Sequence, residues 1–138
     1  MRILLVDDDP VSLRVLRQII SVEPGHQITE AKSGSEAWKL LDNPSLIFDV
    51  VFLDVSMPET DGLQVLARIR ESQILRSQRV VMCTATSDRE TVQKVIQLGT
   101  SHFIVKPATA PRVHAKLQQI QAEIAADSAP GTRARGLV

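Results

Sequence analysis

The sequence has a single cysteine, no excess of charge of either sign and no long hydrophobic run, and each absence narrows the class of protein. Cys83 alone excludes a disulfide framework within the chain, and its place inside an apolar run indicates a small buried hydrophobe. Lysine plus arginine and aspartate plus glutamate each number 16, so the zero net charge gives no sign of nucleic-acid binding. No stretch is long enough for a signal peptide or a membrane span. These absences indicate a cytoplasmic protein.

The sequence does contain a regular alternation of strand and helix patterns. Five apolar runs predict strands over 3–6, 27–31, 48–54, 79–84 and 102–105. A helical spacing of apolar residues follows each of them, and the last helix is predicted over 110–126. Strand followed by helix, five times, predicts an α/β domain with a parallel sheet covered on both faces. Residues 127–138 contain Pro130, Gly131 and Gly136 and almost no apolar residue, so we assign the domain to 1–126 and expect a disordered tail at 127–138.

Several polar residues mark the predicted starts of helices. Asp9 precedes a proline and is expected to cap the first helix with its carboxylate. Ser33 with Glu36, and Ser87 with Glu90, have the spacing of a capping box. These assignments give Asp9 a structural role and leave it out of the candidate chemistry.

The chemistry is expected where the predicted strands end. Val50 to Leu53 run directly into Asp54, and the carboxyl ends of parallel strands are where ligands bind in open α/β sheets. The corresponding strand ends supply Asp7, Asp8, Asp54, Thr84 and Lys106. Three converging carboxylates need a cation between them, and oxygen ligands alone favour Mg²⁺ over zinc. A lysine and a hydroxyl beside that cation can donate to phosphate oxygens, so transfer of a phosphoryl group to a carboxylate is predicted.

Four short motifs carry a family resemblance: ILLVDDDP, LDVSMPETDG, MCTAT and FIVKPA. In this order and spacing they resemble the CheY-like receiver domains of two-component response regulators, over about Arg2 to Ala126. The resemblance implies a flavodoxin-like, doubly wound sheet of five parallel strands in the order 2-1-3-4-5, with five helices. It also implies a phosphoacceptor signalling module in a phosphorelay, which assists only its own phosphotransfer and dephosphorylation and is not an enzyme.

The resemblance assigns the metal and the phosphoacceptor residue by residue. Asp54 matches the phosphoacceptor aspartate. Asp7 and Asp8 match the acidic pair that holds Mg²⁺, with Asp8 the more direct ligand and Asp7 acting partly through water. Ser56 matches the residue whose backbone carbonyl also binds the metal.

Three further residues match the phosphoryl-binding and switching positions of the family. Thr84 and Lys106 match the residues that contact the phosphoryl group, and the Lys106–Pro107 bond is expected to be cis, as is usual in the family. Phe103 matches the switching aromatic residue, although it lacks a hydroxyl group. Ala108 stands where the family often has phenylalanine, which is expected to loosen packing there.

The resemblance also implies partners. A histidine kinase or a histidine phosphotransfer protein is expected to phosphorylate the chain, and a downstream protein to bind the face formed by the fourth helix, fifth strand and fifth helix. No nucleic acid or membrane is expected as a partner, and a homodimer remains open. Only about a dozen residues follow the last helix, so we expect a stand-alone receiver; the alternative is the receiver part of a larger regulator.

A phosphatase of the haloacid dehalogenase type is the enzymatic alternative. The run Asp7 to Val11 fits its D-x-D-x-[TV] motif with Asp7 as nucleophile, and Thr84 and Lys106 would serve as later motifs. That family needs a further acidic pair after the lysine, whereas this chain offers only Glu123 and Asp127 there, and Asp54 would have no role.

Other side chains are given structural interpretations. His26, His102 and His114 lack the spacing of metal ligands and are expected at the surface. Trp38 is expected to pack within the fold.

Overall fold

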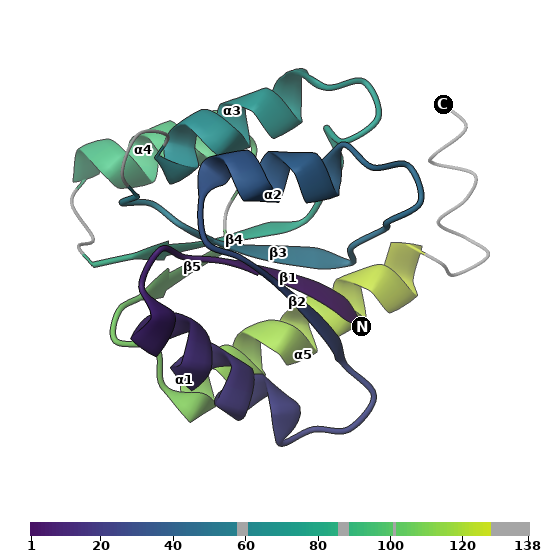
Figure 1. The fold of residues 1–138 in the computed structure, drawn as a ribbon, viewed down its shortest axis with the longest axis vertical. Helices are drawn as coiled ribbons and strands as arrows, with labels where there is room; N and C mark the ends of the chain where they lie inside the picture. The colour runs from purple at the N-terminus through teal and green to yellow at the C-terminus, as the bar shows by residue number, and fades with distance from the viewer. Residues whose placement is uncertain (58–60, 86–88, 101, 128–138) are drawn as a thin grey trace.

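The computed structural model describes residues 1–57, 61–85, 89–100 and 102–127, and shows one sheet between two layers of helices (Figure 1). The strands are β1 (Arg2–Val6), β2 (Gln27–Ala31), β3 (Val50–Asp54), β4 (Val80–Thr84) and β5 (His102–Val105). The helices are α1 (Pro10–Ser21), α2 (Gly34–Leu41), α3 (Gly62–Glu71), α4 (Arg89–Gln97) and α5 (Ala110–Asp127). All strand pairs are parallel and their order is β2-β1-β3-β4-β5, which confirms the predicted fold class.

The sheet is buried on both faces, as the unbroken apolar runs predict. In β1, Leu4 and Val6 belong to a core cluster that includes residues of α2, α3 and α4, whereas Ile3 and Leu5 belong to a second cluster with α1 and α5. Burial of each such side chain contributes about 1.5–3 kcal/mol to folding. The two clusters hold the strands between the helical layers, so the strand ends are fixed relative to one another.

The element boundaries differ from the predicted ones by one or two residues. β3 begins at Val50 instead of Phe48, because Asp49 bonds to Arg2 through both its backbone and its side chain. The Asp49 amide donates to the Arg2 carbonyl at 2.8 Å, and the Asp49 carboxylate accepts from the Arg2 amide at 2.7 Å. α5 continues through Asp127, one residue into the predicted tail, and the rest of that tail lies outside the described residues. Among the described residues, no helix is long and apolar enough to cross a membrane.

Two of the predicted helix starts can be compared with the structure. Asp9 caps α1, as predicted, by accepting from the Val11 amide and the Ser12 hydroxyl, both at 3.0 Å. Ser33 caps α2, but Glu36 accepts from the amide of Lys32 and not from that of Ser33, so this capping box is only half formed. The predicted box at Ser87 lies outside the described residues.

α3 has the fully reciprocal capping box. The Asp61 carboxylate accepts from the Gln64 amide at 2.9 Å, and the Gln64 side chain accepts from the Asp61 amide at 3.0 Å. These paired bonds satisfy two of the free amide groups that every helix start leaves. They stabilise the first turn of α3, which begins at Gly62.

One guanidinium group ties two loops together at the amino ends of β4 and β5. The side chain of Arg70 donates to the carbonyl of Leu98 and the hydroxyl of Thr100, both at 2.7 Å. It also donates to the carbonyls of Arg76 and Gln78, at 2.9 and 2.7 Å. The Arg70 side chain therefore links the α3–β4 loop to the α4–β5 loop.

Candidate functional site

The parallel strands bring their polar carboxyl ends to one edge of the sheet. Asp54 and Thr84 end β3 and β4, whereas Asp7 and Lys106 follow directly after β1 and β5. Asp7, Asp54 and Thr84 are only 2%, 4% and 3% exposed, although each carries a polar side chain. We call Asp7, Asp8, Asp54, Thr84 and Lys106 together the acidic site.

Three carboxylates converge in the acidic site. Asp7, Asp8 and Asp54 each offer an oxygen that lies within 4.8 Å of the others. Asp7 is held in place because its carboxylate accepts from the Asp9 amide at 2.9 Å and its own amide donates to the Ala31 carbonyl at 3.1 Å. Asp8 is exposed and faces solvent from the same cluster. Such a set of charged oxygens, without nitrogen or sulfur, can hold a hard divalent metal ion.

Lys106 is the cation that lies among these carboxylates. Its Nζ donates to Asp7 Oδ2 at 2.8 Å and lies 3.0 Å from Asp54 Oδ1. Its backbone is fixed by a 2.7 Å bond from its amide to the Thr84 carbonyl, and the Lys106–Pro107 bond is cis, as the resemblance implied. Burial by itself lowers the pKa of Lys106, but the bonds to Asp7 and Asp54 outweigh it and raise that pKa above its ordinary value.

The charge balance of the acidic site is unfavourable for Asp54. Burial raises the pKa of Asp54 above its ordinary value, and the nearby charges of Asp7 and Asp8 raise it further, while Lys106 opposes both. One ammonium thus faces three carboxylates. A divalent cation would relieve the excess negative charge, and so the donor set fits such an ion.

Ser56 follows two residues after Asp54 and is exposed, between half-buried Val55 and buried Met57. The Val55 amide donates to the Cys83 carbonyl at 2.9 Å, so the chain remains bonded to β4 just before Ser56. The next residues, 58–60, lie outside the described part of the chain.

Thr84 and Phe103 lie on neighbouring strands and on the same face of the sheet. Met82 is the register partner of Phe103, and Thr84 lies two residues further along β4, which places it on the same side. Phe103 is half-buried and packs against the core cluster that includes α2, α3 and α4. The two residues therefore share the face of the sheet on which the cluster with α2, α3 and α4 lies.

Comparison with known proteins assigns the family. The model of the response regulator receiver domain matches residues 3–118. The chain is a response regulator receiver domain. It is 35% identical over 119 residues to the chemotaxis protein CheY of Listeria monocytogenes, covering 86% of this chain and 97% of that one, and 36% identical to CheY of Bacillus subtilis, covering 81% and 90%. The structure of a CheX–CheY–BeF₃–Mg complex from Borrelia burgdorferi matches with a TM-score of 0.79 at 31% identity, covering 87% and 88%.

As a receiver domain, the chain is a phosphoacceptor signalling module of two-component systems and not a true enzyme, and a kinase partner is implied.

The positions of the acidic residues after Lys106 also argue against a phosphatase of the haloacid dehalogenase type. Glu123 and Asp127, the only acidic residues after Lys106, pair with Arg79, which precedes β4 at the opposite edge of the sheet. They cannot complete a metal site beside Asp7.

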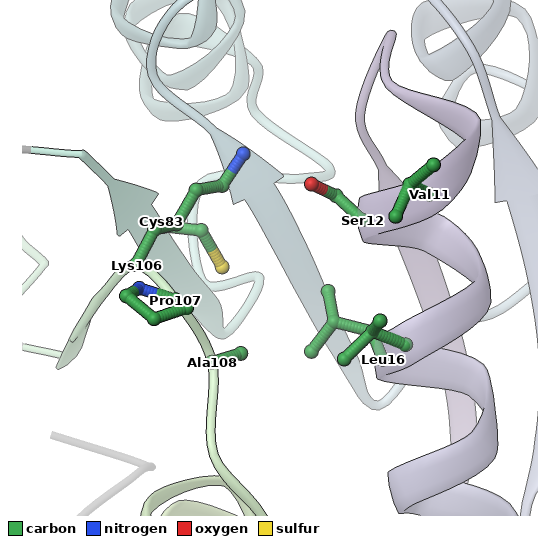
Figure 2. Close-up of a pocket in the computed structure, with 8 residues that line it drawn as sticks. Val11, Ser12, Leu16, Cys83, Lys106, Pro107 and Ala108 are labelled. Atoms are coloured by element: carbon green, nitrogen blue, oxygen red, sulfur yellow. The ribbon is translucent and has the colours of Figure 1, made fainter.

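A groove borders the acidic site of the receiver domain between α1 and the loop after β5. It has a volume of about 390 Å³, and Figure 2 shows Lys106 and Ser12 on opposite sides of it. Its remaining lining is mostly apolar and comprises Val11, Val15, Leu16, Cys83, Pro107 and Ala108. Ala108 lines this groove and also packs against the core cluster of α1 and α5, so the looser packing predicted there stays a prediction. Burial raises the pKa of the Cys83 thiol to about 12, so it remains a neutral, inert part of the groove.

The expected surface position of the histidines is wrong for two of the three. His102 is buried beneath α5, where Nε2 lies 3.2 Å from a Glu123 oxygen and Nδ1 lies 3.4 Å from Lys116 Nζ. The His26 side chain is also buried, 3.0 Å from the amino terminus. His102 shares a strand face with Ile104, which packs against α5, so the alternation of residues along β5 could have revealed its burial. Trp38 packs as predicted, against the core and beneath the Arg68 guanidinium.

Proposed function

We propose that this receiver domain accepts a phosphoryl group on Asp54 from a histidine kinase or a histidine phosphotransfer protein. The observation that carries the proposal is the position of Asp54. Its buried carboxylate ends the central strand between Lys106 and the acidic pair Asp7 and Asp8. We place the exchange in the cytoplasm, where the ATP that charges a histidine kinase is found.

Mg²⁺ is the metal we propose for this site. Asp8 and Asp54 would bind it through carboxylate oxygens and Ser56 through its backbone carbonyl, while Asp7, which Lys106 and the Asp9 amide already hold, would bind partly through water. When bound, the ion neutralises the carboxylates and the phosphoryl oxygens, whose mutual repulsion would otherwise oppose transfer.

The residues of the chain have distinct tasks in the transfer. An oxygen of ionised Asp54 attacks phosphorus, the bond from phosphorus to the donor's histidine nitrogen breaks, and an aspartyl phosphate forms. The ammonium of Lys106 favours the ionised form of Asp54 before transfer, and its N–H groups can donate to the phosphoryl oxygens afterwards. The hydroxyl of Thr84, at the end of the adjoining strand, supplies a further donor.

The groove beside Lys106 supports the approach of a protein donor. Val11 and Val15 are 62% and 39% exposed and lie one turn apart on α1, next to the groove. An apolar surface of this kind beside Asp54 fits a partner that must bring a phosphohistidine to the carboxylate.

We propose that phosphorylation shifts an existing equilibrium through Thr84 and Phe103. A phosphoryl group on Asp54 gives the Thr84 hydroxyl a charged acceptor and favours its inward position. Phe103 shares that face of the sheet and can then rotate toward the space that Thr84 leaves, which changes the α4–β5–α5 surface offered to a downstream protein. Because Phe103 has no hydroxyl group to hold either rotamer, the shift is expected to be shallow.

Labelling by acetyl phosphate tests the site. With Mg²⁺, the wild type should form an acid-stable, base-labile aspartyl phosphate, and Asp54→Asn should form none. Asp9→Asn is the matched control, since it changes an aspartate that caps α1, and it should label like the wild type. Labelling of Asp54→Asn at the wild-type level would show that another residue is the phosphoacceptor.

NMR with beryllofluoride, a phosphoryl mimic, tests the switch. Shift changes should extend from Asp54 to Phe103 and to α4 residues such as Arg89 and Lys94, and Thr84→Ala should reduce them. Changes confined to the acidic site would refute the switch while leaving the phosphorylation site intact.

A further inference from the structure

Gly62, the first residue of α3, lies directly against the peptide group that ends β3. A methyl group on Gly62 would overlap the carbonyl oxygen of Asp54, and would lie 2.9 Å from its carbonyl carbon and 3.0 Å from the Cα of Val55. These neighbours are backbone atoms at the centre of the sheet, so they cannot turn aside as a flexible side chain could. Only a residue without a side chain fits at this position.

The requirement for glycine is one of space and not of backbone conformation. Among the described glycines, positive φ angles occur at Gly25 and Gly99, whereas Gly62 has a helical backbone inside α3. Alanine is a better helix former than glycine, so the helical backbone of α3 does not itself disfavour a methyl group. The close approach of the Asp54 and Val55 backbone opposes it instead.

The contact fixes the peptide from which the Asp54 side chain extends. The Gly62 amide donates to the Val55 carbonyl at 2.8 Å, and the Val55 amide donates to the Cys83 carbonyl at 2.9 Å. The end of β3 is therefore held between β4 on one side and the start of α3 on the other. A displacement of α3 would move both the Asp54 carboxylate and the carbonyl of Ser56, which follows Val55.

We propose that Gly62 is a positioning residue of the acidic site: its missing side chain lets α3 rest on Asp54 and so sets the separation of that carboxylate from Asp7 and Asp8. The proposal rests on the proposed function only in its use of Mg²⁺ as a probe. By this proposal, the start of α3 contributes to the metal affinity of the acidic site as well as to folding.

Two variants at the start of α3 separate positioning from folding. Gly62→Ala adds a methyl group against Asp54, whereas Asp61→Ala removes the cap of the same helix and adds nothing near Asp54. Both should lower the melting temperature. In calorimetric titrations at a temperature where both are folded, Gly62→Ala should raise the Kd for Mg²⁺ by roughly 10–100-fold, as for lost support of a metal ligand, and Asp61→Ala by less than about twofold.

Metal-free NMR spectra give a readout that needs neither Mg²⁺ nor phosphorylation. The amide resonances of Val55 and Thr84 should shift in Gly62→Ala and keep their wild-type positions in Asp61→Ala. Equal Mg²⁺ affinities for the two variants, with unshifted Val55 and Thr84 amides, would overturn the proposal. Failure of acetyl phosphate labelling in the wild type would instead overturn the proposed function and leave this comparison intact.

If Gly62→Ala does not fold, hydrogen exchange in the wild type decides. If Gly62 positions Asp54, then Mg²⁺ bound at the acidic site should stabilise the hydrogen bond from the Gly62 amide to the Val55 carbonyl. Mg²⁺ should therefore slow hydrogen exchange of the Gly62 amide more than that of the Ala37 amide in α2. Equal slowing at both amides would overturn the proposal.

Discussion

The charged side chains at the two edges of the sheet differ in how well their charges balance. At the amino ends of β4 and β5, Arg79 lies beside Glu123 and Asp127 of α5, and the His102 ring lies between Glu123 and Lys116. We call these five residues the α5 cluster; its two cations match its two anions. The acidic site at the other edge places three carboxylates around a single ammonium.

The difference separates a structural arrangement of charges from a functional one. A balanced cluster is satisfied within the chain and contributes modestly to stability. An unbalanced one leaves negative charge that the fold cannot neutralise, and the raised pKa of Asp54 reflects this. A metal ion from outside the chain could supply the missing positive charge.

Removing one carboxylate from the unbalanced edge should have the largest effect. Asp8→Ala should weaken Mg²⁺ binding on the order of tenfold or more, because a charged oxygen ligand is lost from direct contact with the ion. Asp9→Ala should leave the affinity nearly unchanged, since Asp9 already accepts bonds from Val11 and Ser12. Calorimetric titration of both variants measures this, and equal losses would show that the site does not distinguish the two residues.

Neutralising one carboxylate at each edge should change stability in opposite directions. In the metal-free protein at neutral pH, Asp54→Asn should raise the melting temperature by about 2–5 °C, because it removes an ion whose burial is poorly compensated. Glu123→Gln should lower the melting temperature, because Arg79 and His102 lose a charged partner that is partly exposed. The free energy of unfolding should fall by less than about 1 kcal/mol. Thermal unfolding in a chelator is the measurement, and a shift of the same sign for both would contradict the comparison.

The stabilising effect of Asp54→Asn should depend on pH. A carboxyl group whose pKa is raised by folding stabilises the fold fully only below its ordinary pKa of 3.8, and this contribution is lost as the pH rises through the folded-state value. The advantage of the variant should thus be present at pH 7 and shrink on acidification toward pH 4. A gap that widens toward acid would mean that folding lowers the pKa of Asp54 instead.

A modest effect is expected at Asp9, which borders the acidic site without belonging to it. The bond from the Val11 amide, and then that from Ser12, lower the pKa of Asp9, so its contribution to stability is present above the ordinary value of 3.8 and lost as the pH falls below it. Asp9→Ala should reduce the melting temperature by a few degrees at pH 7, and part of this difference should be lost as the pH falls below 3.8. A difference that is unchanged in strong acid would show that the charge of the Asp9 carboxylate adds nothing to its capping bonds.

The elements, and the grouping of polar residues at one edge, could be predicted from the sequence because both depend on local patterns. The apolar run before Asp54 and the helix signal at Asp9 each lie within a few residues, and parallel strands necessarily align their carboxyl ends. The strand order was not contained in these patterns. It came from the family resemblance, and the structure confirms it.

Contacts between residues distant in the chain could not be predicted from local patterns. The bridge from Lys106 to Asp7 joins residues 99 positions apart, and nothing around Lys106 specifies which carboxylate its ammonium contacts. The burial of His102 depends on α5 crossing β5, and the close approach of Gly62 depends on where α3 settles on β3. Each of these contacts depends on how the whole chain packs and not on the residues that are adjacent in the sequence.

Arg70 holds the carboxyl end of α4 in place. Its guanidinium joins the loop before β4 to the carboxyl end of α4, through four acceptors that would all have to be released for that end to move. A motion of α4 that keeps these bonds would leave its carboxyl end nearly in place, so displacement would grow toward its amino end, the end nearer the carboxyl edge of the sheet. If phosphorylation shifts α4 as proposed, these bonds would therefore favour an angular movement of the helix over a displacement of the whole helix.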